Sequence, residues 1–307
     1  MGQHRVMPPH RDTIAPRDPA RLRSLLAWSP SPVVRASLGL HAGGLLALAA
    51  EPAAWPEVLG LLAANHAGLA GCMHPRCGLL GPNLTRLPGA PPRVALTFDD
   101  GPDPEVTPRV LDLLDAAGAR ASFFVLGEAA ARQGPLLREM LRRGHGIENH
   151  THRHPLGFAT WGPGAMLAEI ETAQRAIADA CGQAPRLFRP PAGLRSPLLD
   201  PVLALASLSL VSWTRRGYDT VSSRPERVLA RLLRGLAPGD VLLLHDGRLG
   251  RRQGQPSVAL ALLPRLLAAL AAAGLSAASL DEAPVADATA APAGAAASPG
   301  SAAYASR

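Results

Sequence analysis

The sequence predicts a parallel α/β fold over residues 93–282. Two observations predict it: short apolar runs have the length of buried strands, and they alternate with longer stretches that have the apolar spacing of helices. Seven such runs alternate with six such stretches. This alternation is compatible with a closed barrel and with an open doubly wound sheet, because both are built from repeated strand–helix units.

The elements follow in order along the chain. We expect strands at 94–98, 121–125, 145–149, 186–189, 208–213, 241–245 and 276–280. In the first helix, Thr107 is the expected N-cap, Pro108 lies in the first turn and Gly118 ends the helix. We expect the other helices near 128–143, 164–181, 198–206, 224–236 and 257–273.

Two apolar stretches precede this domain, at 36–50 and 58–71, with the sequence EPAAWPE between them. We predict an apolar helical hairpin over 36–75 that associates with a membrane, either spanning it or inserting shallowly. A soluble helical lid and an export signal are the alternatives. Arg is absent from 37–75 but flanks it on both sides, so a spanning hairpin would place the large domain in the cytoplasm. A periplasmic or exported location is the alternative.

The remaining segments are compositionally biased. Residues 1–35 are rich in Arg and Pro and are expected to form a flexible basic leader. Residues 76–92 read as a linker rich in Gly and Pro, and 283–307 as a disordered tail of Ala, Pro and Ser.

Charge and cysteine content exclude some classes of function. The formal net charge is +7, but residues 94–307 hold 22 Arg against 20 acidic residues, so the large domain is near neutral. With only 4% aromatic residues as well, a nucleic-acid partner is not expected. Three cysteines cannot all pair, which excludes a disulfide framework.

Ionisable residues follow nearly every predicted strand at its C-terminal end. They are Asp99 and Asp100, then His150, His152 and His154, then Arg189, Asp219, His245 and Asp246. In barrels and open sheets alike, this edge carries the active site.

Together these residue types form a set suited to hydrolysis. Two imidazoles and one carboxylate leave open positions on a divalent metal ion, which can polarise a carbonyl and acidify water. A second carboxylate could accept the water's proton, and a histidine could protonate the leaving group. The sequence therefore indicates hydrolysis of an acyl or amide-like bond without a covalent intermediate. It contains no nucleophile elbow, P-loop or dinucleotide fingerprint.

Five segments carry a resemblance to a known family. They are TFDDGP at 97–102, HTHRHP at 150–155, RPPAG at 189–193, WTRRGYD at 213–219 and LLLHD at 242–246. In this order they resemble the motifs of the polysaccharide deacetylases, which form the NodB homology domain or carbohydrate esterase family 4. The resemblance covers 93–282 and implies a distorted (β/α)7 barrel that removes acyl groups, most often N-acetyl groups, from sugars with the help of a metal ion.

The resemblance also implies a role for individual residues. Asp100, His150 and His154 match the ligands of one divalent metal ion, Zn2+ in the first place, with Co2+, Ni2+ or Mn2+ as alternatives. His152 falls at a position that the family does not use as a ligand. Asp99 matches the general base.

The acid side of the reaction is matched in the same way. His245 matches the general acid and Asp219 the aspartate that orients it, while Arg189 matches the arginine that holds the base. Leu243 matches the lining of the acyl-methyl pocket, and Ala192 stands where a backbone N–H helps to form the oxyanion hole.

Two positions depart from the family pattern. Ala192 and Thr220 stand where many members have an aromatic residue, so an aromatic wall for a long glycan is missing. We therefore expect a hydrolase that removes an N-linked acyl group from an amino sugar or glycan. A deacetylase or deformylase of a lipid-linked sugar at the membrane is the first alternative, and a non-catalytic glycan-binding or scaffold protein is the second.

Overall fold

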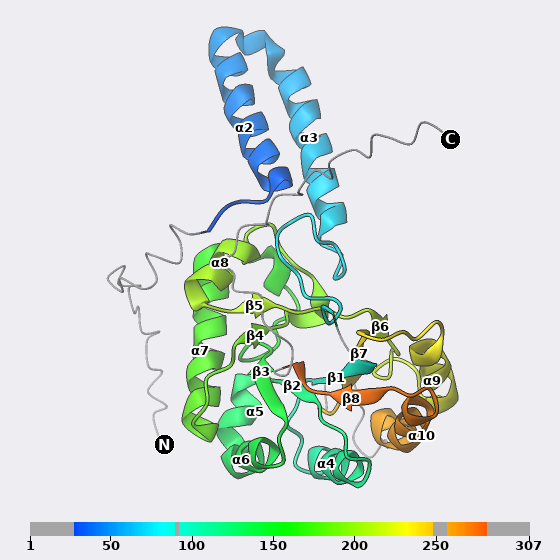
Figure 1. Ribbon diagram of the computed structural model, residues 1–307. Helices are drawn as coiled ribbons and strands as arrows, with labels where there is room; N and C mark the ends of the chain where they lie inside the picture. The colour runs from blue at the N-terminus through cyan, green and yellow to red at the C-terminus, as the bar shows by residue number, and fades with distance from the viewer. Residues whose placement is uncertain (1–27, 90–91, 248–256, 281–307) are drawn as a thin grey trace, which may run out of the picture.

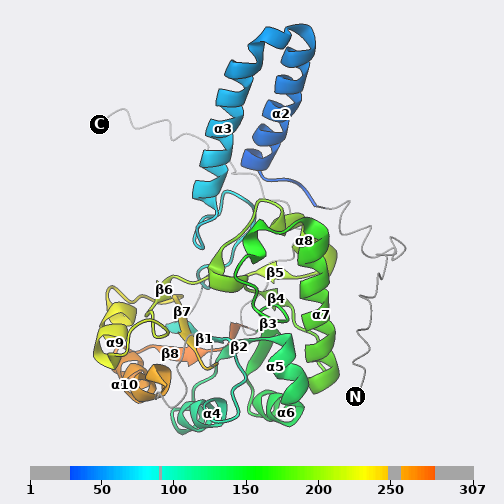
Figure 2. The same cartoon turned by 180° about the vertical axis from the view of Figure 1, so that it is seen from behind.

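The protein consists of a helical hairpin that projects from an α/β barrel (Figures 1 and 2). The computed structural model describes residues 28–89, 92–247 and 257–280. The predicted tail at 283–307 and the predicted leader up to residue 27 lie outside the described residues.

The hairpin comprises α2 (Pro32–Ala50), the 3-10 turn η1 (Pro52–Ala54) and α3 (Trp55–Cys72). Helix α2 begins within the segment predicted to be flexible, because Pro32 fits the first helical turn and the Ser31 hydroxyl accepts a hydrogen bond from the Val34 N–H. The two helices pack side by side and leave most of their apolar side chains in solvent, with Leu45 71% and Leu46 73% exposed. Among the described helices, α2 alone is long and apolar enough to span a membrane.

The barrel is a curled parallel sheet, which confirms the predicted fold class and the barrel form. Its strands are β1 (Arg93–Asp99), β2 (Ser122–Val125), β3 (Gly146–Asn149), β4 (Leu187–Phe188), β5 (Ser209–Leu210), β6 (Arg215–Arg216), β7 (Val241–His245) and β8 (Ser276–Ala278). The order is β5-β4-β3-β2-β1-β7-β6, and β8 pairs with the first half of β1 while β2 pairs with its second half. Strand β6 was not predicted, because a two-residue strand of arginines has no apolar pattern.

The gap between β5 and β6 is crossed by the segment predicted to be a linker. Leu84 bridges Val211, which follows β5, and Arg86 bridges Asp240, which precedes β7. Leu87 is buried in the barrel interior. The chain that leaves the hairpin is therefore part of the barrel wall.

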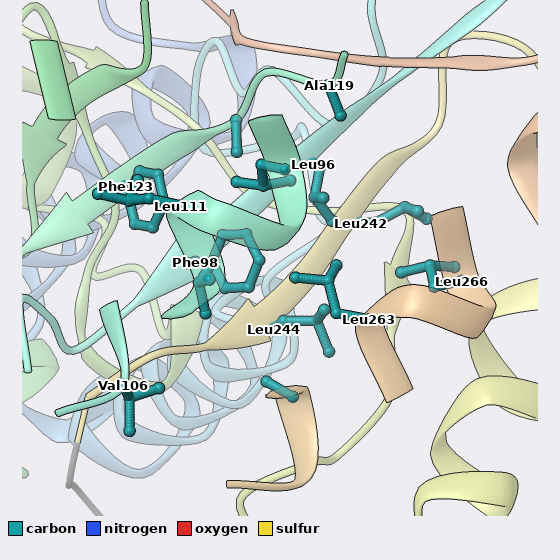
Figure 3. Close-up of a cluster of buried hydrophobic side chains, with 14 of the residues drawn as sticks. Leu96, Phe98, Val106, Leu111, Ala119, Phe123, Leu242, Leu244, Leu263 and Leu266 are labelled. Atoms are coloured by element: carbon teal, nitrogen blue, oxygen red, sulfur yellow. The ribbon is translucent and has the colours of Figure 1, made fainter. Parts of the chain in front are cut away.

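Side chains alternate between the two faces of each strand, as the strand geometry requires. On β7, Leu242 and Leu244 face outward into the core between sheet and helices, whereas Val241 and Leu243 face the barrel interior. Figure 3 shows the outer core, where Phe98 of β1 and Phe123 of β2 stack with ring centroids 5.1 Å apart. On β1 the inward positions next to this core are Thr97 and Asp99.

Helices cover the outside of the sheet (Figure 1). They are α4 (Thr107–Ala116), α5 (Gly127–Arg132), α6 (Gly134–Arg142), α7 (Pro163–Cys181), α8 (Leu199–Ala206), α9 (Pro225–Leu233) and α10 (Val258–Ala272), with 3-10 turns η2 (Phe158–Thr160) and η3 (Pro191–Gly193). The single helix expected near 128–143 is two helices, because Pro135 restricts the residue before it and cannot continue an α-helical hydrogen-bond ladder.

The predicted N-cap of α4 is wrong. Thr107 is the first helical residue, and its hydroxyl accepts the Asp103 N–H and donates to the carboxylate of Asp246. The N-cap residue is Val106, and the carboxylate of Asp103 accepts the N–H groups of Glu105 and Val106 in the turn before the helix.

Candidate active site

The end of β1 places two carboxylates side by side at the C-terminal edge of the barrel. Asp99 is the last strand residue, and its inward-facing carboxylate is held by Arg189, whose Nη1 lies 2.5 Å from Oδ1. Asp100 follows in a left-handed conformation with φ 73°, which turns its side chain away from the strand alternation. Both residues are less than 10% exposed.

Arg189 is fully buried and its guanidinium is fixed on several sides. Its Nη1 donates to the Thr97 hydroxyl as well as to Asp99, and its Nη2 donates to the Ser212 carbonyl. The Cζ atom of Arg189 lies 3.9 Å from the ring centroid of Phe124. Arg189 therefore holds the Asp99 carboxylate in one position.

Two histidines complete a cluster around Asp100. The loop after β3 brings Nε2 of His150 to 3.4 Å and Nε2 of His154 to 3.6 Å from Oδ1 of Asp100. One ligand atom from each of the three residues lies within 4.8 Å of the others. Nδ1 of His150 lies 2.7 Å from the Arg189 carbonyl, and donation to that carbonyl leaves Nε2 as the lone-pair nitrogen facing the cluster.

The chemistry of this cluster fits a divalent metal ion. Oδ1 of Asp100 is buried and has no hydrogen-bond partner among the described residues, so it lacks the compensation that a buried carboxylate oxygen normally has. Burial raises the pKa of Asp100, but the neighbouring imidazole of His150 lowers it overall. Burial also lowers the pKa of His154, with the charge of His150 adding to the effect. An ionised carboxylate and a neutral imidazole are the forms that bind metal.

The loop that carries the histidines is held by a buried carboxylate on α7. Oε1 of Glu169 accepts the N–H groups of His152 and Arg153, two of the three residues between His150 and His154. The Thr151 hydroxyl accepts the His154 N–H, and His154 has a left-handed φ of 55°. These bonds stabilise a backbone conformation that non-glycine residues seldom adopt. The His152 side chain points toward Gly127 of α5 and does not join the cluster.

A second histidine system lies at the end of β7. Nδ1 of His245 lies 2.9 Å from Oδ1 of Asp219, and Oδ2 of Asp219 accepts the His245 backbone N–H at 2.8 Å. The remaining ring nitrogen, Nε2, is left for another partner. Burial alone would lower the pKa of His245, but the charges of Asp219, Asp100 and Asp99 and the hydrogen bond that the ring donates to Asp219 raise it to about 9. The surroundings of His245 therefore favour its imidazolium form.

The last two predicted site residues, Leu243 and Ala192, lie beside the ionisable residues described above. Leu243 is buried on the inner face of β7, between Thr97 of β1 and Arg216 of β6 in the strand register. Ala192 sits in η3 with φ 55° and lines a cavity together with Trp213. The structure thus brings all nine predicted residues to one edge of the barrel, on loops that follow β1, β3, β4, β6 and β7 or on those strands themselves.

Known proteins resemble this chain in sequence and in fold. Residues 87–210 match the family described as Polysaccharide deacetylase. A chitooligosaccharide deacetylase of Bradyrhizobium sp. (strain ANU 289) is 41% identical over 155 residues, which make up 50% of this chain and 70% of that protein. The chain belongs to the polysaccharide deacetylase family. Like its relatives, it is a hydrolase of the deacetylase type that acts on carbon–nitrogen bonds other than peptide bonds.

Other members of the polysaccharide deacetylase family agree with this assignment. A peptidoglycan-N-acetylglucosamine deacetylase of Bacillus cereus (strain ATCC 14579) is 35% identical over 176 residues, covering 56% of this chain and 81% of that protein. A family 4 carbohydrate esterase from Streptomyces lividans, solved in complex with acetate, is 34% identical and superposes with a TM-score of 0.55. The superposition covers 62% of this chain and 93% of that structure.

Two buried residues of this polysaccharide deacetylase were not assigned a role from sequence. Glu169 lies in the middle of a helix, and its sequence position gives no sign that it binds a loop. Asp246 directly follows His245 and is fully buried, and burial together with the charge of Asp100 raises its pKa to about 7 against the hydrogen bond from Thr107. The sequence signal for Asp246 was its position after a strand.

Proposed function

We propose that this polysaccharide deacetylase hydrolyses the N-acetyl amide of an acylated amino sugar. The observation that carries the proposal is the juxtaposition of the Asp100–His150–His154 cluster with a second carboxylate, Asp99, which Arg189 holds in place. The relatives named above act on chitooligosaccharide and on peptidoglycan N-acetylglucosamine, which supports an N-acetylglucosamine unit as the acylated sugar.

We assign the metal site to Asp100, His150 and His154, with Zn2+ as the first candidate and Co2+, Ni2+ or Mn2+ as alternatives. A divalent ion held there supplies polarisation of the amide carbonyl and a lowered pKa for water. Three protein ligands leave positions open, as a catalytic site requires.

Asp99 is assigned as the general base. Its Oδ2 lies 3.8 Å from Nε2 of His150, so the carboxylate borders the proposed metal site without being part of the cluster. Arg189 occupies Oδ1 and holds the carboxylate in one orientation. The other oxygen is then free to accept a proton from the attacking water.

His245 is assigned as the general acid and Asp219 as its positioning residue. Breaking the C–N bond leaves a basic amine nitrogen, which needs a proton to depart. The imidazolium form of His245, favoured by Asp219, carries that proton on Nε2. Water addition, proton transfer through Asp99 and protonation by His245 yield acetate and the free amino sugar.

The acyl group is proposed to lie between Ala192 and Leu243. The Ala192 N–H would donate to the oxygen that gains charge in the transition state, and the Leu243 side chain would contact the acyl methyl group. Because the oxyanion donor is a backbone group, the replacement of the family's aromatic residue by Ala192 removes sugar contact but not this hydrogen bond.

A lipid-linked sugar is a second candidate substrate, favoured by one observation. The hairpin of residues 36–75 exposes leucines on both helices, including Leu45, Leu46 and Leu59, far from any core. We propose that these side chains insert into a membrane, by spanning it or lying in it, and that the domain at 93–282 works beside the membrane surface. The side of the membrane is left to experiment.

The test is release of acetate and formate by full-length protein loaded with Zn2+. Substrates are N-acetylglucosamine oligomers and an extracted lipid-linked sugar fraction. Asp99→Asn should lower turnover about 100-fold or more, and Asp112→Asn, at an exposed carboxylate on α4, is the matched control. Release that is equal in wild type and Asp99→Asn would overturn the proposal. Metal binding without release from any substrate would favour the non-catalytic alternative.

A further inference from the structure

A cavity of about 460 Å3 adjoins the proposed catalytic residues. One wall is Ala192, and another is the strand β6 with the residues after it, up to Tyr218. Tyr218 directly precedes Asp219, which holds His245, and Arg216 of β6 pairs in register with Leu243. The cavity therefore shares its walls with the site where the acyl group is proposed to bind.

Of the residues that the structure describes, several arginines and no acidic residue line the cavity. Arg76, Arg215, Arg216 and Arg231 all contribute to its surface. Arg215 is neutralised from behind by Asp240, whose Oδ2 lies 2.5 Å from Nε, and its other nitrogens bind the carbonyls of Arg234 and Gly235. Across the part of the chain that the structure describes, none of the other three is paired with an acidic side chain.

These three guanidiniums are nonetheless held in place. Arg231 donates to the Gly217 carbonyl, and Arg76 lies 3.5 Å from the Thr214 carbonyl. Arg216 lies between two rings, 5.4 Å from the centroid of Trp213 and 5.0 Å from that of Tyr218. Its Nε is buried and has no hydrogen-bond partner within residues 28–89, 92–247 and 257–280. A buried donor without an acceptor, in a cavity with several uncompensated positive charges, indicates that an anion completes the site.

We propose that this cavity binds the phosphate or diphosphate group of the substrate, so that the enzyme acts on an acylated amino sugar linked through phosphate. This inference rests on the proposed function and names its substrate class. Guanidinium groups bind phosphate oxygens through paired, charge-assisted hydrogen bonds, and three of them match the charge of a diphosphate better than that of a single carboxylate. A neutral glycan would leave the same charges uncompensated.

Two sources of such a sugar share this chemistry, a soluble nucleotide sugar and a sugar on a polyisoprenyl diphosphate. The position of the cavity bears on the choice. His74, Pro75 and Arg76 line it and follow α3 within four residues of its last residue, Cys72. The cavity therefore lies at the base of the apolar hairpin, where a lipid-linked diphosphate would be found if the hairpin enters a membrane.

Binding is tested first, without turnover. Inorganic pyrophosphate and UDP-N-acetylglucosamine are titrated into full-length Asp99→Asn protein by calorimetry. Arg76→Gln, Arg216→Gln and Arg231→Gln each remove one arginine. Each variant should bind both probes about tenfold more weakly. Because Arg231 and Arg76 are exposed, these two variants remain informative if Arg216→Gln fails to fold. Arg227→Gln is the matched control, since Arg227 is exposed on the same helix α9 but does not line the cavity.

Equal binding of pyrophosphate to Arg227→Gln, Arg231→Gln and Arg76→Gln would overturn the inference. Turnover by the wild type then distinguishes failure of the phosphate site from failure of the proposed function. Deacetylation of N-acetylglucosamine oligomers without arginine-dependent pyrophosphate binding would keep the proposed function and refute the phosphate site. Arginine-dependent binding without deacetylation of any probe would keep the phosphate site and refute the proposed function. A higher kcat/KM for a detergent-solubilised polyisoprenyl diphosphate sugar than for UDP-N-acetylglucosamine would identify the lipid-linked source, and the reverse ratio the nucleotide sugar.

Discussion

The carboxylate of Asp99 and the guanidinium of Arg189 form an ion pair that is sealed from solvent, with Nη1 and Oδ1 2.5 Å apart. Asp99 ends β1 and Arg189 follows β4, so the pair crosses the inside of the barrel. Each charge depends on the other, because a buried ion without its partner has no water to replace it. The pair thus links the proposed base to the stability of the barrel.

Removing the arginine should therefore destabilise the protein. We expect Arg189→Leu to lower the free energy of unfolding by about 3 kcal/mol or more, because it leaves the Asp99 carboxylate buried and unpaired. Asp99→Asn/Arg189→Leu should recover part of this loss, since no buried charge remains. Urea denaturation measures both. An Arg189→Leu protein as stable as the wild type would show that Asp99 does not depend on the pair.

The metal cluster predicts a difference between neighbouring histidines. His150→Ala and His154→Ala should each lower zinc affinity by at least 100-fold, a loss of about 2.7 kcal/mol, because each removes one of three ligands. His152→Ala is the control, since that side chain lies between them in sequence but faces Gly127. Metal content after dialysis against a competing chelator gives the affinity. Stoichiometric zinc in His150→Ala would exclude it as a ligand.

Glu169 should act on the metal site without touching it. Glu169→Ala removes the acceptor for the N–H groups of His152 and Arg153 and frees the loop that carries the histidines. We expect zinc affinity to fall about 10-fold to 100-fold, as for other residues that hold metal ligands in position. Asp179→Ala, at an exposed carboxylate on the same helix α7, should bind zinc as the wild type does. Loss of affinity in both variants would point to helix stability instead.

The pH profile should report the pair of His245 and Asp219. His245 donates its proton only while it is protonated, so activity should fall as pH rises through its pKa of about 9. Because the folded-state pKa lies above the ordinary value, the stability that the pair contributes is present below about pH 6.5 and is also lost as pH rises through about 9. Asp219→Asn removes the main charge that raises this pKa, and the alkaline limb of kcat should move to lower pH. An alkaline limb that stays in place in Asp219→Asn would remove His245 from the acid role.

The hairpin predicts a membrane-binding defect from one charge. Leu46 is 73% exposed four residues before the end of α2, and Leu46→Arg should cost about 3 kcal/mol of insertion free energy if that position enters hydrocarbon. Co-sedimentation with lipid vesicles should fall sharply. Leu79→Arg provides the control, because Leu79 is also exposed but follows the hairpin. Equal sedimentation of Leu46→Arg and wild type would make the hairpin a soluble lid.

The sequence predicted the residues that follow from a local pattern combined with parallel topology. Asp99, His150, Arg189 and His245 each stand at or just after a strand end, and parallel strands bring such ends to one edge. Their convergence could therefore be predicted before any coordinates were known. The roles assigned to them stay predictions until the variants above are measured.

What the sequence could not predict depends on contacts between distant segments. Arg76, Arg216 and Arg231 come from a loop, a two-residue strand and a helix, and only the folded chain shows that they share a cavity. Leu84 has no strand pattern of its own, and its place in the barrel wall comes from pairing with Val211. Tertiary contacts of this kind override local propensity.

The pairing of Leu84 with Val211 also limits where a protease could release this enzyme from its hairpin. A cut beyond residue 87 would remove the segment 84–87 from the barrel wall and expose leucines of the barrel interior. A cut directly after Arg76 would keep the pairing of Leu84 with Val211. It would also keep the carbonyls of Cys77 and Gly81, to which Arg195 donates hydrogen bonds. The shed fragment would then be a complete barrel that has lost one of the four arginines facing its substrate. If the hairpin enters a membrane and the cavity binds substrate, as proposed, this one cleavage would both release the enzyme and change its substrate preference.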